Sequence, residues 1–191
     1  MESINNYIKH LVVSLKYPLI FIAFLWVIQL VDVIFFQQGL GLTYGIHPRD
    51  ISGLTGIFFA AFLHGSFDHI IGNSIMLLLL SWIICANNTN LWIKTIIFGI
   101  FLGGLFTWVF GHSPSSHFGA SGVVFALWGT ILGLAIFHKK PFFIIATLIL
   151  FSSYGLGLFL GLVPTPGISF AGHFGGLLAG FACAKQVRYN K

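Results

Sequence analysis

Residues 95–138 read TIIFGIFLGGLFTWVFGHSPSSHFGASGVVFALWGTILGLAIFH, a run of 44 residues without Asp, Glu, Lys or Arg. A second uncharged run of the same length follows at residues 141–184. A helix needs about 20 residues to cross the hydrocarbon core of a bilayer, so each run has room for two spans and a turn. Residues 112–117 and 163–167 mark the turns, because proline removes a backbone donor there and Ser or Thr side chains offer local hydrogen bonds.

Two more apolar segments lie upstream of these runs. Because backbone groups facing lipid must be satisfied within their own segment, helices are the expected form of every span. The composition agrees, since 57% of the 191 residues are hydrophobic, 7% are charged and the mean hydropathy is +0.97. The sequence therefore predicts an all-α polytopic membrane protein, a single transmembrane domain over residues 1–191 with six helices at about 18–36, 67–86, 91–111, 119–137, 141–162 and 169–186.

The connection between the first two spans, residues 37–66, is the long one. Its six glycines and one proline argue against a single regular helix, yet residues 57–63 within it are strongly apolar. We expect a partly embedded loop that rests in the outer leaflet.

Basic residues indicate the orientation. With the N-terminus inside, the inner segments carry Lys9, Lys16, Lys94, Lys139, Lys140, Lys185, Arg188 and Lys191, and the outer loops carry Arg49 alone. This bias predicts a multi-pass protein of the cytoplasmic membrane with both termini in the cytoplasm. The net charge of +5 is explained by these helix-end anchors, and no clustered basic patch calls for nucleic acid as a partner.

Four polar side chains inside the spans are expected near one membrane surface. His69 and Asn73 lie one and two turns into the second span, Ser121 lies at the start of the fourth, and His173 lies about one turn into the sixth. These three spans all run from outside to inside on the charge-based topology. At about 1.5 Å per residue, the four side chains fall within roughly 10 Å of the outer boundary and can share one pocket.

These residue types suit acyl transfer. A serine hydroxyl needs a base to take its proton, and His173 is the only histidine placed in the sixth span to do so. His69 and Asn73, four residues apart on one helix face, can stabilise an oxyanion together with the Ser121 backbone N–H. With only four acidic residues in the chain, none of them suitably placed, we expect a Ser–His dyad.

Three further residues are expected to support this site. Gly119 and Gly122 flank the serine and would let a peptide backbone approach its hydroxyl. Phe125 lies one turn after Ser121 on the same face, so its ring can stack on the His173 imidazole or simply pack between helices.

Three blocks of the sequence together resemble the signature of the rhomboid intramembrane serine proteases. They are HGSFDHIIGN at residues 64–73, GASG at 119–122 and GHFGGLLAG at 172–180, in the family's order and on the corresponding helices. The resemblance covers the chain from the first span to the last, in the minimal six-helix form. The Trp-Arg pair of many relatives is absent from the first loop, where Pro48-Arg49-Asp50 stands instead.

The resemblance implies roles and partners. Ser121 matches the family's nucleophile, His173 its general base, and His69 and Asn73 its oxyanion-stabilising pair, while His64 matches a structural histidine. The implied substrates are membrane-anchored proteins cut within or near the outer end of a transmembrane helix. Entry is ascribed in the family to movement of the fifth helix and the following cap loop, here residues 151–168, and the site opens to the external face.

Other readings of the histidines remain to be weighed. A zinc protease would need H-E-x-x-H, but the only glutamate is Glu2, and an aspartyl membrane protease would need paired intramembrane aspartates, whereas only Asp32 lies well within a span. We therefore expect no metal and no cofactor. The remaining rivals are a catalytically inactive rhomboid-like protein that binds transmembrane clients and a small transporter.

Overall fold

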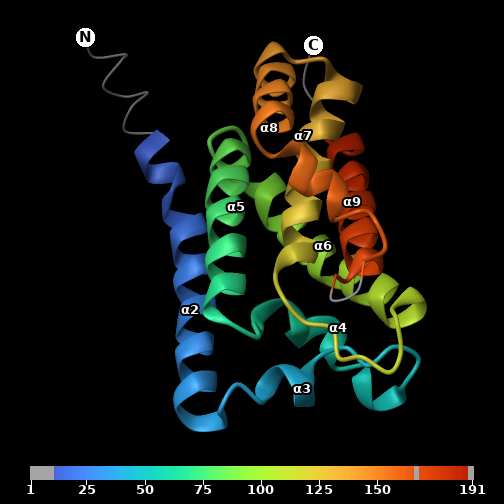
Figure 1. Cartoon of the computed structure of the whole chain (residues 1–191). Helices are drawn as coiled ribbons and strands as arrows, with labels where there is room; N and C mark the ends of the chain where they lie inside the picture. Colours follow the sequence, from blue (N-terminus) through green and yellow to red (C-terminus); the bar gives the residue numbers. More distant parts are fainter. Residues whose placement is uncertain (1–10, 166–167, 189–191) are drawn as a thin grey trace.

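The computed structural model describes residues 11–165 and 168–188, which form a bundle of long helices closed at one end by short ones (Figure 1). The long helices are α2 (Lys16–Phe36), α5 (Phe67–Cys85), α6 (Thr89–Phe110), α7 (Ser121–His138), α8 (Pro141–Leu160) and α9 (Phe170–Lys185). Within the described residues, five helices are long and apolar enough to cross a membrane, and the first of them runs from Leu11 to Phe36. The all-helical membrane fold predicted from the sequence is confirmed.

The last helix, α9, is the shortest of the long helices and packs closely on two of them. It has 16 residues, fewer than the roughly 20 of a full span, and it packs mainly on α6 and α7. Glycines permit this close packing: a Cβ on Gly176 would collide with the carbonyl oxygen of Gly122, and one on Gly180 with that of Ala126. Hence α9 reaches into the protein interior and carries His173 with it.

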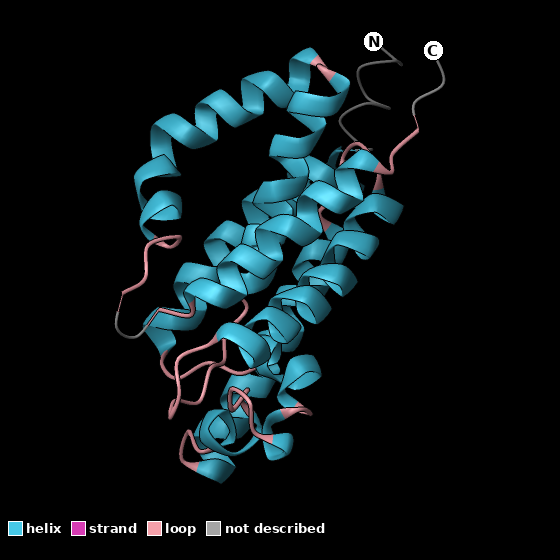
Figure 2. Cartoon of the chain, turned by 90° about the vertical axis from the view of Figure 1, so that its right-hand side faces the viewer, coloured by secondary structure: helices cyan, strands magenta, loops and turns pink. Residues whose placement is uncertain are grey.

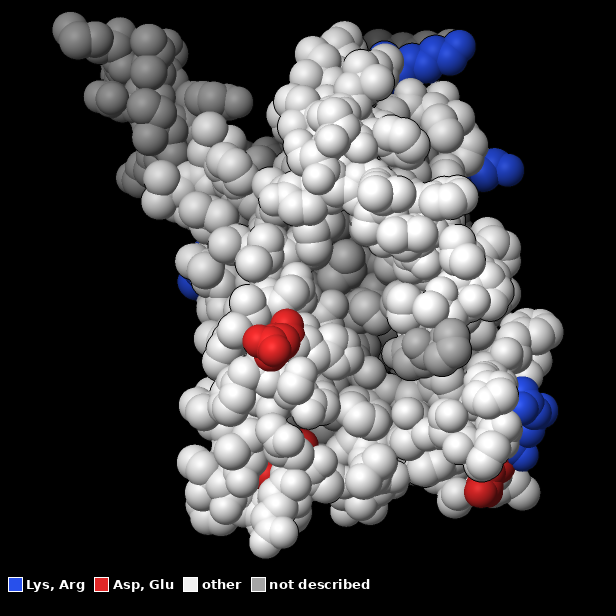
Figure 3. All heavy atoms as spheres, viewed as in Figure 1, with Lys and Arg blue, Asp and Glu red and all other residues white. Residues whose placement is uncertain are grey.

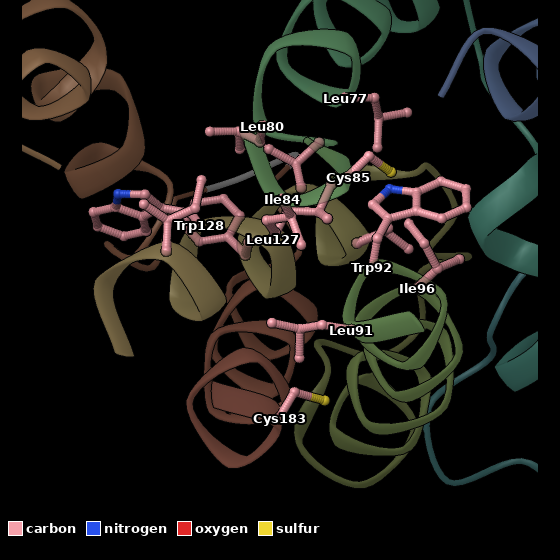
Figure 4. Close-up of a cluster of buried hydrophobic side chains, with 14 of the residues drawn as sticks. Leu77, Leu80, Ile84, Cys85, Leu91, Trp92, Ile96, Leu127, Trp128 and Cys183 are labelled. Atoms are coloured by element: carbon pink, nitrogen blue, oxygen red, sulfur yellow. The ribbon is translucent and has the colours of Figure 1, made fainter. Parts of the chain in front are cut away.

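Hydrogen bonds between threonines join the same helices. The Thr95 and Thr130 hydroxyls lie 3.0 Å apart across α6 and α7, and the Thr130 hydroxyl is also within reach of the carbonyl oxygens of Ala126 and Gly180. Away from the end that the short helices cover, large apolar side chains from α5, α6 and α7 fill the bundle (Figure 4). This packing fixes the relative positions of the three helices that carry the predicted site residues.

The connection between α2 and α5 folds into α3 (Leu40–Tyr44), η1 (Ile51–Gly53), α4 (Gly56–Phe59) and η2 (Ala60–Phe62). Ile57 is buried against α6, where a Cβ on Gly104 would strike it, while Phe58 and Phe59 are exposed. One side of the segment thus faces the bundle and the other is free to face lipid, as a partly embedded loop requires.

Arg49 and Trp108 anchor this loop to the end of α6. One guanidinium nitrogen of Arg49 donates to the carbonyl oxygens of Val109, at 3.1 Å, and Gly111, at 2.9 Å. The Trp108 indole N–H donates to the Asp50 carbonyl oxygen at 2.8 Å, and the Arg49 backbone N–H to the Trp108 carbonyl oxygen at 2.9 Å. An Arg-Trp contact across the two segments therefore anchors a loop that lacks an adjacent Trp-Arg pair.

The Asp50 carboxylate accepts a hydrogen bond from the Ser52 backbone N–H at 2.9 Å, which holds the pKa of this carboxyl below its usual value. In Figure 3, the acidic side chains visible on the face turned toward the viewer lie in its lower half, where Figure 1 shows α3 and α4.

Helix α8 is attached to the bundle mainly along one side. Figure 2 shows it leaning away from the rest of the bundle. It packs mainly on α7, and its buried residues are Phe143, Leu150, Gly155 and Leu158. Most of its surface is therefore available to lipid.

Candidate active site

The N-terminal ends of α5, α7 and α9 lie at the end of the bundle that the short helices cover (Figure 1). Ser121 is the first residue of α7, and His173 lies in the first turn of α9. The common level expected for these residues from the charge-based topology is thus the one that they occupy.

Ser121 and His173 are hydrogen-bonded. The Ser121 Oγ lies 2.7 Å from His173 Nε2, and His173 Nδ1 lies 2.7 Å from the carbonyl oxygen of Gly161. A carbonyl oxygen only accepts, so Nδ1 must carry the proton in this bond. The lone pair of a neutral ring then sits on Nε2, facing the serine hydroxyl, which is the arrangement a general base needs.

The ring of Phe125 stacks on the His173 imidazole, which is one of the two arrangements that the sequence left open. The ring centroids are 4.3 Å apart and the planes are inclined by 13°. Both side chains are buried, and the Phe125 and Trp128 rings make a T-shaped contact with their centroids 5.9 Å apart. The imidazole is therefore held by one ring face and by hydrogen bonds at both nitrogens.

The backbone before Ser121 is held by the loop that precedes α5. Gly119 has φ of +130°, a conformation that favours glycine, and its N–H donates to the carbonyl oxygen of Ala60 at 2.8 Å. The next N–H, that of Ala120, points to His64 Nε2 at 3.4 Å. His64 must be unprotonated at Nε2 to accept this bond, and burial lowers the pKa of the His64 side chain.

His69 lies beside this turn, and Asn73 lies one helical turn further along α5. A Cβ on Gly119 would come within 2.8 Å of His69 Nε2, so the missing side chain makes room for that ring. Asn73 is buried, and its Nδ2 has no partner among the described residues. The Nδ2 donor of Asn73 is therefore available to an added acceptor.

The two flanking glycines have a packing role of their own. Gly119 accommodates His69, and Gly122 lets α7 approach α9, since a Cβ there would lie 3.3 Å from the carbonyl oxygen of Gly172. Close approach of a substrate backbone, the reason expected from the sequence, stays a prediction.

One hollow adjoins the dyad, and a second lies next to the first. A cavity of about 40 Å³ lies beside Ser121 and His173 and is also lined by Thr107 and Ser169, whose hydroxyls are 3.4 Å apart. Its size admits water. A wider hollow of about 740 Å³ is lined by residues between 110 and 117 and by residues 164–165 and 168–171, and it shares His117 and Ser169 with the first. The two hollows therefore share part of their wall near the dyad.

The model of the rhomboid domain matches residues 52–190. The chain belongs to the rhomboid family. A protein of Mycobacterium bovis and one of Mycobacterium tuberculosis, both described as uncharacterized, are each 34% identical to it over 178 residues, or 87% of this chain and 72% of theirs. A protein of Mycobacterium leprae with the same description is 30% identical over 177 residues, 87% of this chain and 68% of its own.

The structure of this rhomboid includes groups that sequence reasoning missed. Gly161 takes part through its carbonyl oxygen, and a backbone atom has no signal in the sequence. Thr107 and Ser169 were also missed. Ser169 could have been found, because it precedes His173 by one helical turn in the sequence. In the structure its carbonyl oxygen accepts the His173 N–H. Among the described residues, no three His, Cys, Asp or Glu side chains gather as metal ligands would.

Proposed function

We propose that this protein is an intramembrane serine protease that hydrolyses peptide bonds of membrane-anchored proteins within or near the outer end of a transmembrane helix. The observation that carries the proposal is the 2.7 Å contact between the Ser121 hydroxyl and a His173 ring whose proton is kept on the far nitrogen. Helices α2 to α9 serve as one transmembrane domain that holds this pair.

Each step of the reaction has a group to perform it. His173 Nε2 takes the hydroxyl proton as Ser121 Oγ bonds to the scissile carbonyl carbon, and the carbonyl electrons move to the oxygen. His69, the Asn73 amide and the Ser121 N–H are the donors for that oxyanion. The protonated His173 then gives its proton to the leaving amine, and the peptide bond breaks.

Water completes the cycle. It attacks the acyl-serine while His173 again takes a proton, and the serine leaves with that proton restored. The cavity beside Ser121 and His173, with the Thr107 and Ser169 hydroxyls in its wall, is the place for this water. No step needs a metal, so we expect activity to survive a chelator.

The one-sided attachment of α8 supports lateral entry of the substrate. The face in Figure 3 is hollowed between α5 and the lower part of α8. A substrate helix arriving from the lipid there would meet the dyad from the side. We further propose that both termini are cytoplasmic and that the site opens to the external face of the cytoplasmic membrane.

Purified protein in liposomes, incubated with a single-span test substrate, tests the assignment. We expect cleavage by the wild type and none by Ser121→Ala or His173→Ala, together with covalent labelling of Ser121 by a fluorophosphonate probe. Cleavage retained in either variant would place the chemistry elsewhere. Binding of the test substrate without any cleavage by the wild type would instead identify a client-binding protein.

A further inference from the structure

The hydrogen-bond partner of His173 Nδ1 comes from a helix that packs mainly on one other helix, α7. Gly161 is the C-terminal cap of α8, and its carbonyl oxygen accepts the Nδ1 proton at 2.7 Å. The other elements of the dyad lie on α7 and α9, which pack closely along their glycines. Thus the orientation of the base depends on a helix that is attached to the bundle mainly along one side.

Gly161 fits tightly against the stacked rings. A Cβ at this position would lie 2.7 Å from Phe125 Cζ and 3.3 Å from His173 Nδ1. The backbone of Gly161 is right-handed helical, so an alanine would be tolerated by its torsion angles and resisted only by these two rings. Only a glycine lets the end of α8 come this close.

The same end of α8 has an electrostatic effect on the ring. The last carbonyl groups of a helix have no partner within the helix and carry partial negative charge. They favour the imidazolium that forms when His173 takes the serine proton. In a Ser–His–Asp triad a carboxylate orients the histidine, and here a helix C-terminus occupies that place.

We propose that docking of α8 on α7 positions the catalytic base, with the Gly161 carbonyl as the positioning group that holds His173 as its Nδ1–H tautomer. This inference rests on the proposed protease function. When α8 moves outward, His173 loses the acceptor at Nδ1, and the lone pair is no longer confined to Nε2. The helix beside which a substrate enters therefore also completes the base, and hydrolysis proceeds only after α8 has returned onto α7.

Two alanine variants of one helix provide the first test. Gly161→Ala introduces the methyl group that the rings oppose, while Gly157→Ala, one turn earlier, places it where no atom lies within 4 Å. We expect kcat for the single-span test substrate to fall at least about tenfold in Gly161→Ala, with KM changed less than about threefold, and both to stay unchanged in Gly157→Ala. Wild-type kcat in Gly161→Ala would overturn the inference.

The tautomer is measured separately, by ¹⁵N NMR of imidazole-labelled protein, with the His173 signals assigned by their loss in His173→Gln. The wild type should show Nδ1 protonated and Nε2 unprotonated, and Gly161→Ala should show mixed tautomers. A wild-type spectrum in Gly161→Ala would also overturn the inference. If the wild type hydrolyses nothing, the proposed function fails, but the NMR comparison still decides whether α8 orients the ring.

Should Gly161→Ala fail to fold, α8 can be loosened at another buried position. Leu158 is buried and Phe159, its neighbour, is exposed. Leu158→Ala should lower kcat and mix the tautomers, whereas Phe159→Ala should do neither. Equal behaviour of these two variants would contradict a coupling between α8 docking and the base.

Discussion

At the scale of single residues, the His173 imidazole depends on one apolar neighbour as well as on its hydrogen bonds. Phe125→Leu removes the stacked ring but keeps an apolar side chain. An aromatic pair contributes about 0.5–1.5 kcal/mol beyond burial. Since that contribution orients the base, we expect kcat to fall about two- to tenfold. Phe137→Leu, on the same helix far from the site, is the control, and equal kinetics in the two variants would make the stack irrelevant to catalysis.

The oxyanion assignment is tested on α5. Asn73 has an unpartnered Nδ2, and His69 lies against the turn before the nucleophile. We expect Asn73→Ala and His69→Ala each to lower kcat by about tenfold or more while the fluorophosphonate probe still labels Ser121, because loss of one oxyanion donor costs turnover without removing the nucleophile. Unchanged turnover in both variants would show that the oxyanion is stabilised by other donors.

His64 gives an acid-dependent prediction. Burial holds its pKa below the value near 6.5 of an exposed histidine. At a pH between about 6.5 and the lower pKa of His64 in the folded protein, the unfolded chain binds more protons than the folded one. Folding stability therefore falls as the pH drops below about 6.5. His64→Gln keeps an acceptor for the Ala120 N–H but does not titrate. Thermal unfolding in detergent at pH 7 and pH 5 should show a smaller loss in this variant than in the wild type. An equal loss would assign the acid sensitivity to other groups.

At the scale of the helices, the register between α7 and α9 sets the distance between nucleophile and base. Gly122 follows Ser121, and Gly176 follows His173 by three residues. Gly176→Ala would force these helices apart, since the added Cβ would collide with the Gly122 carbonyl oxygen. Overpacking of this kind costs about 1–3 kcal/mol, so we expect a lower melting temperature and at least tenfold lower activity. Gly72→Ala, where no atom lies within 4 Å, should change neither.

The helices were accessible to sequence reasoning, whereas much of the site's support was not. The uncharged runs are long enough for pairs of membrane-spanning helices, so the helical fold could be predicted. Helix geometry places Ser121 and Phe125 on one face, but it left open whether Phe125 stacks on His173 or packs between helices. The Gly161 carbonyl could not, because its role arises from where α8 ends in space. The same holds for Arg49 and Trp108, which are 59 positions apart in the chain and meet only through tertiary packing. Glycines were ambiguous, because helix packing and substrate approach both require a small residue.

At the scale of the whole molecule, the site lies at one end of the bundle and most basic residues at the other. Lys94 lies in the second turn of α6, Lys139 follows α7 and Lys185 ends α9, all remote from the short helices α3 and α4. The cytoplasmic side of a membrane retains such residues, so the dyad should face the opposite compartment. A substrate would then be cut on the external side.

This orientation predicts which positions a membrane-impermeant maleimide can reach. Ser52 is exposed in η1 at the site end, and Asn87 is exposed in the turn between α5 and α6 at the other end. In a background with Cys85→Ala and Cys183→Ala, the only native cysteines, Ser52→Cys should be labelled in intact cells and Asn87→Cys only after lysis. If the predicted topology were wrong by one membrane span between the two positions, one labelling result would change. If the whole protein were inverted, the two results would be exchanged. Labelling of Asn87→Cys but not Ser52→Cys in intact cells would place the dyad on the cytoplasmic side and require the substrate to be cut there.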